Sequence, residues 1–149
     1  MKQRMLLITL IGSGVALSST AQKLNDNEVP AAVKAAMGKK FPGTTKVKWS
    51  KELKDFESEF KKDGKEMSAI FDASGAWKET ETEIKSDELP QSIKAYMAVH
   101  VKGKKIGEAA IIHKQDGSVV YEAEASDTDY LFDANGKLLK IEKEGEKKD

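Results

Sequence analysis

Apolar residues recur at every fourth position in two separate segments, which predicts two amphipathic helices with one apolar stripe each. The stripes consist of Val29, Val33, Met37 and Phe41, and of Leu89, Ile93, Met97 and Val101. Pro30 and Pro90 occupy the same place in the two segments and suit a first helical turn, where a missing N–H costs nothing. Gly43 and Gly103 follow the stripes and favour the end of each helix. The chain therefore contains two copies of one helix, 60 residues apart.

The segments after each helix alternate between apolar and polar residues, which is typical of strands with one buried and one wet face. In the first such segment Val47 and Trp49 share a face, and we expect Trp49 in the core. Turn residues rich in Asp and Gly separate the segments and favour hairpins. The eight predicted strands are residues 46–52, 55–62, 65–73 and 76–84, and then 105–114, 119–126, 128–134 and 138–144.

One phrase occurs twice in nearly the same letters. IFDASGAWKETE begins at Ile70, and LFDANGKLLKIE begins at Leu131, 61 residues later. A unit of one helix and four strands therefore recurs, in repeats of about 27–85 and 86–144. Because a unit of about 60 residues buries little apolar surface alone, we expect an α+β fold in which both repeats form a curved antiparallel sheet with the helices on one face. Residues 22–28 are expected to be a short flexible start.

The first 21 residues have the pattern of a secretory signal peptide. Lys2 and Arg4 make a basic start, an apolar run follows, and Ser19 and Ala21 suit a cleavage site. The apolar run covers about 13 residues, whereas a membrane span needs about 20. The predicted organisation is thus a leader, 1–21, followed by one domain, 22–149, that is periplasmic or secreted. The charged tail 144–149 is expected to fray.

Charge and composition exclude several functions. Without Lys2 and Arg4 the formal net charge is −2, which disfavours nucleic acid and gives no polybasic signal for insertion into a membrane after cleavage. The absence of cysteine excludes thiol nucleophiles and thiolate metal sites. Serine motifs and glycine-rich phosphate loops typical of enzymes do not occur. We therefore expect a non-enzymatic protein with no catalytic residue and no cofactor.

The letters FPGTTKVKWSKE from Phe41 and ESEFKKDGKEMSAIFDASGAWKETE from Glu57, with the Pro-headed helices, resemble the PepSY-like family of exported bacterial proteins. That family is similar in fold to the tandem helix-plus-four-strand inhibitor of β-lactamase. The resemblance extends over the chain after residue 21. The second copy departs from it, with Ile112 or His113 near the Trp49 position and Leu138 near the Trp77 position. The resemblance implies a fold and export, but inhibition of β-lactamase does not carry over. The broader group includes modules thought to restrain peptidases, which motivates an inhibitory role.

A repeated pair of glutamates is the first candidate site. Glu57 and Glu59, and likewise Glu122 and Glu124, stand two apart on a strand, so their side chains point the same way at a separation of about 7 Å. Such pairs suit a basic partner or a hard cation such as calcium. Alternatively, they belong to a solvated sheet face on which the cross-strand lysines Lys46 and Lys48 offset their charge.

Aromatic residues are the second candidate. Trp77 follows a turn and Tyr96 lies off the apolar stripe of its helix, so both are candidate anchors for a partner. His100 and His113 lack the spacing of a metal site. The Asp-rich turns at Asp72 and Asp133 lack the order of ligands found in a calcium loop. No metal site is therefore predicted.

These features favour an exported binding or inhibitory module that presents its sheet surface to an unknown protein or peptide of the cell envelope. The alternative is a binder of a small ligand or cation at the carboxylate-lined sheet. The sequence leaves the oligomeric state open.

Overall fold

The computed structural model describes residues 22–143 and shows a mixed α+β protein. Its helices are α1 (Ala31–Lys40) and α2 (Gln91–His100), preceded by the 3₁₀ helices η1 (Asp26–Glu28) and η2 (Ser86–Glu88). Its strands are β1 (Gln22–Leu24), β2 (Lys48–Glu52), β3 (Asp55–Lys62), β4 (Lys65–Phe71), β5 (Trp77–Ile84), β6 (Glu108–Lys114), β7 (Val119–Glu124), β8 (Thr128–Asp133) and β9 (Leu138–Lys143). The expected leader and the expected tail lie outside the described residues.

The strands form one open sheet in which each pairs antiparallel with its neighbours in the sequence. The prediction of eight strands was wrong, because the segment expected to be a flexible start contains β1 and η1. β1 pairs with β2 from Gln22 opposite Lys51 to Leu24 opposite Trp49. Three residues are too few to show an alternating pattern, so this strand could not be predicted from the sequence.

Each helix packs against the sheet through its predicted apolar stripe. All stripe residues are at most 8% exposed. The first core cluster joins the α1 stripe to Trp49, Phe56, Phe60, Ala69 and Phe71. The second joins the α2 stripe to Ala109, Ala123, Ala125 and Phe132. Trp49 is 7% exposed, which confirms its expected place in the core.

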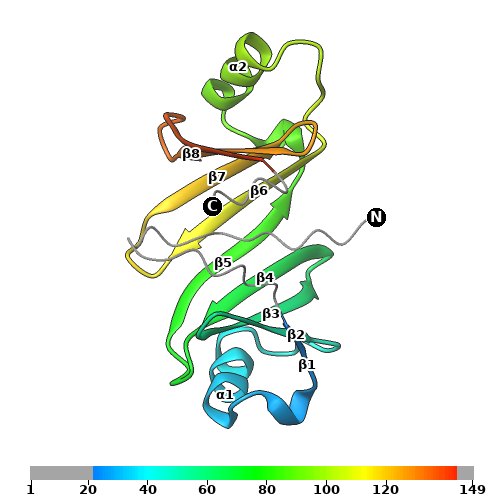
Figure 1. Cartoon of the computed structure of the whole chain (residues 1–149), viewed down its shortest axis with the longest axis vertical. Coiled ribbons are helices and arrows are strands. Elements are labelled where there is room, and N and C mark those ends of the chain that lie inside the picture. The colour runs from blue at the N-terminus through cyan, green and yellow to red at the C-terminus, as the bar shows by residue number, and fades with distance from the viewer. Residues whose placement is uncertain (1–21, 144–149) are drawn as a thin grey trace.

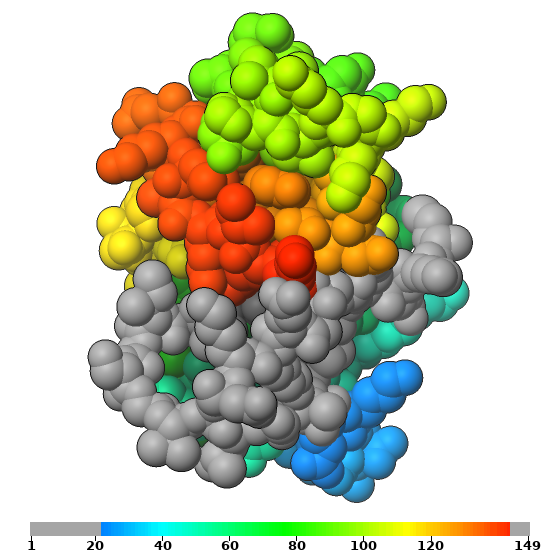
Figure 2. All heavy atoms as spheres, turned by 45° about the horizontal axis from the view of Figure 1, so that its top comes forward, coloured from blue at the N-terminus to red at the C-terminus, as the bar shows by residue number. Residues whose placement is uncertain are grey.

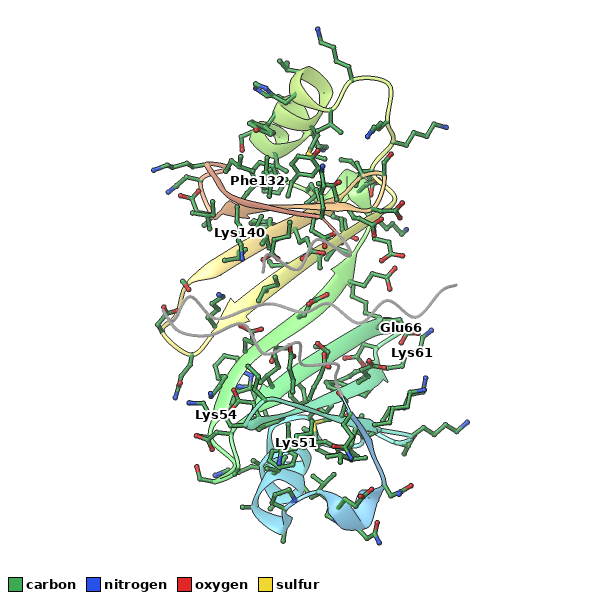
Figure 3. All side chains as sticks on the ribbon, in the orientation of Figure 1. Lys51, Lys54, Lys61, Glu66, Phe132 and Lys140 are labelled. Atoms are coloured by element: carbon green, nitrogen blue, oxygen red, sulfur yellow. The ribbon has the colours of Figure 1, made fainter. Side chains whose placement is uncertain are left out.

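The two helices lie at opposite ends of the long axis, with the twisted sheet between them (Figure 1). From the side shown in Figure 2, α2 in yellow-green lies beside the orange and red side chains of β8 and β9. Phe132 points from β8 toward α2, whereas Lys140 lies on the other side of the same strand pair (Figure 3). The sheet at this end therefore has one face toward the helix and one face away from it.

The pairing register relates the two core clusters. Ala69 pairs with Thr80 on β5, and Ile84, four residues further along β5, pairs with Ala109. Because directly paired side chains and alternate residues of a strand point to the same face, residues of both clusters share one face of the sheet. We call this the helix face.

The repeated phrase folds into the same type of turn in both halves. In the β4–β5 turn, Asp72 Oδ1 accepts hydrogen bonds from the backbone N–H of Ser74 at 2.9 Å and of Ala76 at 3.1 Å. In the β8–β9 turn, Asp133 Oδ1 accepts two bonds of 2.9 Å, from the N–H groups of Asn135 and Lys137. These aspartates bind backbone N–H groups, so the prediction that they form hairpin turns is confirmed.

The glycine of each phrase packs against a helix. Gly75 has φ +86° and Gly136 has φ +82°, a region that favours glycine. A Cβ on Gly75 would lie 2.6 Å from the carbonyl oxygen of Ala32, and one on Gly136 would overlap Ser92 Oγ. The turn therefore lies directly against the first turn of its helix, which accounts for the glycine in both phrases.

The register also corrects the expected counterpart of Trp49. Leu24 pairs with Trp49 beside α1, and Ile84 pairs with Ala109 beside α2. Ala109, rather than Ile112 or His113, holds the Trp49 position in the second half. Ile112 lies on the opposite face of the sheet. None of the helices within residues 22–143 has the length and apolar character needed to cross a membrane.

Candidate functional site

The face of the sheet turned away from the core clusters carries most of the acidic strand residues, and we call it the carboxylate face. Its acidic residues, assigned by the pairing register, are Glu52, Asp55, Glu57, Glu59, Glu66, Glu79, Glu81, Glu83, Glu108, Glu122, Glu124, Asp129, Asp133 and Glu142. The lysines that the register places on this face are Lys23, Lys48, Lys61, Lys114 and Lys140, and Lys78 reaches it through its contact with Asp55. The near-neutral charge of the whole chain thus conceals an uneven distribution, because acidic residues outnumber lysines on this face, although Glu57, Glu79, Glu122 and Glu124 are buried in it.

The first predicted pair lies at the β2–β4 end of this face. Glu57 stands between Ser50 and Ile70 on the neighbouring strands, and Ser50 Oγ donates a hydrogen bond of 3.1 Å to Glu57 Oε2. Glu59 stands directly opposite Lys48, as expected for a lysine that offsets its charge. Burial raises the pKa of Glu57 to about 7, the bond from Ser50 opposes this rise, and the charge of Glu59 adds to it.

The second predicted pair lies on β7. Glu122 stands between Ala110 and Leu131, so it has no charged residue directly opposite on either neighbouring strand. Glu124 stands between Glu108 and Asp129. Burial, followed by repulsion from Glu81, raises the pKa of Glu122 to about 9. Glu122 therefore lies among acidic residues whose charges add to the rise in its pKa.

Glu81 on β5 connects the two pairs electrostatically. It stands opposite Ser68 on β4 and Ile112 on β6. Burial, followed by the charge of Glu57, raises its pKa to about 8. Glu81 in turn raises the pKa of Glu122. The structure thus brings the four predicted glutamates onto one face and places a further glutamate between them, which the sequence analysis missed.

A small ionic network at the edge of this face was also missed. Lys78 Nζ lies 2.7 Å from Asp55 Oδ2, and Lys114 Nζ lies 4.0 Å from Glu79 Oε2. Burial raises the pKa of Glu79, while Lys114 opposes the rise. Lys78 is the extra residue of a β-bulge between Trp77 and Glu79. The alternating pattern of β5 hides such a bulge, so this contact could not be predicted from the sequence.

Ile112, Val120 and Leu131 form a cluster of buried apolar side chains on the carboxylate face, where Ile70 is a further apolar residue beside Glu57. Ile112 stands directly opposite Val120, and Leu131 stands directly opposite Glu122. We call these three residues the apolar patch. It lies on strands β6 to β8, beside Glu122 and Glu81.

The two predicted aromatic anchors do not join this site. Trp77 is half-buried against the first core cluster; its indole N–H donates a 2.8 Å hydrogen bond to Thr80 Oγ1, and Lys40 Nζ lies 3.7 Å from its ring centroid. Tyr96 is half-buried against the second core cluster, with its ring stacked on His100 at 4.2 Å and edge-on to Phe132 at 5.2 Å. Both rings belong to the helix face, away from the four glutamates.

Within residues 22–143 no group of three or more histidine or acidic side chains has the geometry to hold a metal ion. Repeated carboxylates spaced along a sheet are better suited to several separate cationic groups than to one ion. The arrangement can therefore attract and orient positively charged side chains over a broad surface.

Fold and surface together define an α+β protein built on one open antiparallel sheet with an acidic face. The chain belongs to the family described as "Putative beta-lactamase-inhibitor-like, PepSY-like", whose profile matches residues 15–69 and 63–140. A comparison with curated proteins gives no match.

Solved structures share this fold. A "BLIP-like protein" from Bacteroides fragilis is 27% identical, with a TM-score of 0.61 over 76% of this chain and 85% of that chain. A DUF2874 family protein from Bacteroides uniformis is 22% identical, with a TM-score of 0.69 over 76% of this chain and 88% of that one. A protein from Bacteroides eggerthii described among "putative periplasmic proteins" is 17% identical, with a TM-score of 0.71 over the same shares. The latter two show similarity of fold alone.

Proposed function

We propose that this protein is an exported, non-enzymatic binding or inhibitory module that presents the carboxylate face to a protein or peptide partner. The observation that carries the proposal is the concentration of acidic side chains on the face opposite both core clusters, where no described helix packs. A surface of one charge favours a partner of opposite charge and speeds its association.

The proposal includes a duplicated architecture. The rows Ser50–Glu57–Ile70 and Ala110–Glu122–Leu131 have the same register in the two halves, which supports two copies of one helix-plus-four-strand unit in one curved sheet. Duplication would place a corresponding row with a glutamate in each half of the face. The domain would then extend over residues 22–149 after removal of the leader.

Location and the lack of catalysis are parts of the same proposal. The leader pattern in residues 1–21 and the description given to the Bacteroides eggerthii protein support a periplasmic or secreted location. The family description refers to inhibitor-like proteins and to no reaction, which supports a non-enzymatic role.

The test is capture of a partner from the native cell envelope with tagged protein 22–149, read by mass spectrometry. Glu83→Lys and Glu59→Lys reverse charges on the carboxylate face and should release the partner. The matched control is Asp87→Lys, a reversal at an exposed residue of η2, which should retain it. Failure of the wild type to capture any specific protein, or equal capture by all variants, would contradict the proposal. Calorimetric titration with calcium tests the alternative of a cation binder.

A further inference from the structure

We propose that the outer edge of β9 pairs antiparallel with the same edge of a second copy of this chain, about a two-fold axis at Ile141. The two sheets would then become one, with their carboxylate faces side by side. This inference concerns an edge of the sheet, and it adds to the proposed function without depending on it.

The first half of the sheet shows that this edge is built to accept a strand. In the repeated phrase β9 takes the place of β5, and both strands have a bulge at the same point of their pairing with the preceding strand. The other side of β5 pairs with β6, from Glu79 opposite Lys114 to Ile84 opposite Ala109. Within residues 22–143 no strand pairs with the corresponding side of β9. The edge of β9 therefore matches a strand that is paired on both sides.

The side chains of β9, red in Figure 2, are accessible. Leu139 is 54% exposed and Ile141 is 50% exposed, and the side chain of Lys140 is 43% exposed. β1, at the opposite edge of the sheet, has three residues, whereas β9 has six. A long edge strand with exposed apolar residues is a template for pairing with another chain.

The backbone alternation determines which residues of β9 face outward. In the first half Lys78, which takes the place of Leu139, accepts at its C=O a 2.7 Å hydrogen bond from the N–H of Gln115, directly after β6. Alternate residues of an antiparallel strand direct their backbone groups to the same neighbour. Leu139 and Ile141 therefore direct theirs away from β8, and Lys140 between them directs its groups toward β8.

Charge selects the register of the pairing. An axis at Ile141 places Lys140 of each copy directly opposite Glu142 of the other, whereas an axis at Lys140 or at Glu142 would place like charges opposite each other. Lys140 Nζ already contacts Glu142 Oε1 within one strand, so the four charges at the axis would alternate in sign. Opposite charges directly across two strands stabilise their pairing. A lysine on an edge strand usually opposes pairing, but in this register it gains a carboxylate partner.

Sedimentation equilibrium of protein 22–149 over a range of concentrations tests the inference, and we expect a reversible monomer–dimer equilibrium. Lys140→Glu and Glu142→Lys each place two like-charge pairs across the axis, so each should weaken dimerisation about tenfold or more. An equimolar mixture of these two variants should associate within about threefold of the wild type, because every cross-strand pair of the mixed dimer joins a glutamate to a lysine.

Lys61→Glu and Glu66→Lys provide the matched controls. They make the same charge changes at an ion pair of 3.1 Å on the carboxylate face, on β3 and β4 and away from the edge. Association of each control should stay within about twofold of the wild type, since salt screens charges distant from the interface. Circular dichroism of every variant verifies its fold.

Ile141→Pro tests the role of the backbone. The substitution removes an N–H that faces outward, a place where an edge strand tolerates proline. It should keep the circular dichroism spectrum of the wild type and remain monomeric at concentrations at which the wild type is a dimer. A dimer of this variant as tight as that of the wild type would overturn the inference.

Three further results would also overturn it. The first is a wild-type protein that stays monomeric up to about 1 mM, where specific binding is already very weak. The second is a dimer that the charge reversals at Lys140 and Glu142 leave unchanged. The third is a pair of weakened variants that do not recover on mixing. Capture of an envelope partner requires no self-association, so these results leave the proposed function standing.

Discussion

Replacement of Gly75 by alanine tests whether the repeated turn is a packing element between sheet and helix. Gly75 has φ +86°, and an added Cβ would lie 2.6 Å from the Ala32 carbonyl oxygen and 3.0 Å from its carbon. These are backbone atoms of α1, so they cannot rotate away as a side chain could. The change therefore forces the turn and the helix apart.

Gly117 provides a matched control. It stands in a turn of the same form with φ +84°, but an added Cβ there has nothing within 4 Å. Gly117→Ala should lower the unfolding free energy by about 1 kcal/mol, because alanine is strained at a positive φ. Gly75→Ala should lower it by the same amount and by a further ~1–3 kcal/mol through overpacking against α1. The predicted difference in unfolding free energy between the two variants is thus about 1–3 kcal/mol.

Urea unfolding followed by circular dichroism measures this difference for both variants and the wild type. The lower midpoint should belong to Gly75→Ala, with unchanged steepness of the transition. Equal destabilisation by the two substitutions would refute the packing of the turn against α1. In that case the glycine of the repeated phrase would serve only the backbone conformation of the turn.

Three further predictions concern charge and strain. The pKa of Glu57 in the folded protein is raised to about 7 from 4.5, so its contribution to stability is full below pH 4.5 and is lost as pH rises through about 7. Glu57→Gln should therefore be more stable than the wild type at pH 8, by up to about 3 kcal/mol, and should gain little at pH 5. Urea unfolding of both proteins at the two pH values measures this difference. Leu53 has φ +54° in the β2–β3 turn and is 64% exposed, so Leu53→Gly should raise the unfolding free energy by about 0.5–1 kcal/mol, and a lower melting temperature would contradict this. Lys40→Met should lower stability by about 0.5–1 kcal/mol through loss of the contact with the Trp77 ring, whereas Lys39→Met should not, as thermal melts of the two variants would reveal.

Local patterns predicted the elements well where each element has a clear period. The α1 and α2 stripes are buried as expected, and the alternation of β3 predicted its bounds, Asp55–Lys62. The turns were predictable because aspartate and glycine have defined backbone roles. The sequence failed at β1, whose three residues owe their strand conformation to pairing with β2. It also failed at the bulge beside Trp77, which depends on the register of two strands.

The candidate site was predictable only in part. Alternation placed Glu57 with Glu59, and Glu122 with Glu124, on a common face within each strand. It could not indicate that Glu81 stands between the pairs, because that depends on the order of strands across the sheet. It also could not show that Ile112, Val120 and Leu131 meet on this face, because each comes from a different strand.

Trp77 and Tyr96 lie apart from the glutamates. Their sequence positions, after a turn and off a helical stripe, made them candidate anchors for a partner, and that role stays a prediction. In the structure the Trp77 ring is held by Thr80 and Lys40, and the Tyr96 ring contacts Phe132. Large rings near the rim of a small core are drawn against it because they bury so much apolar area.

Photo-crosslinking in the native cell tests the central claim most directly. A photoreactive residue is placed at Glu83 or Glu59 on the carboxylate face, and at Lys39 or Asp87 on the helix side. The account predicts adducts with one specific envelope protein or peptide from the two carboxylate-face positions and none from the two helix-side positions. Adducts from the helix-side positions alone would contradict this prediction, because the partner would then bind the helix side of the protein and not the carboxylate face.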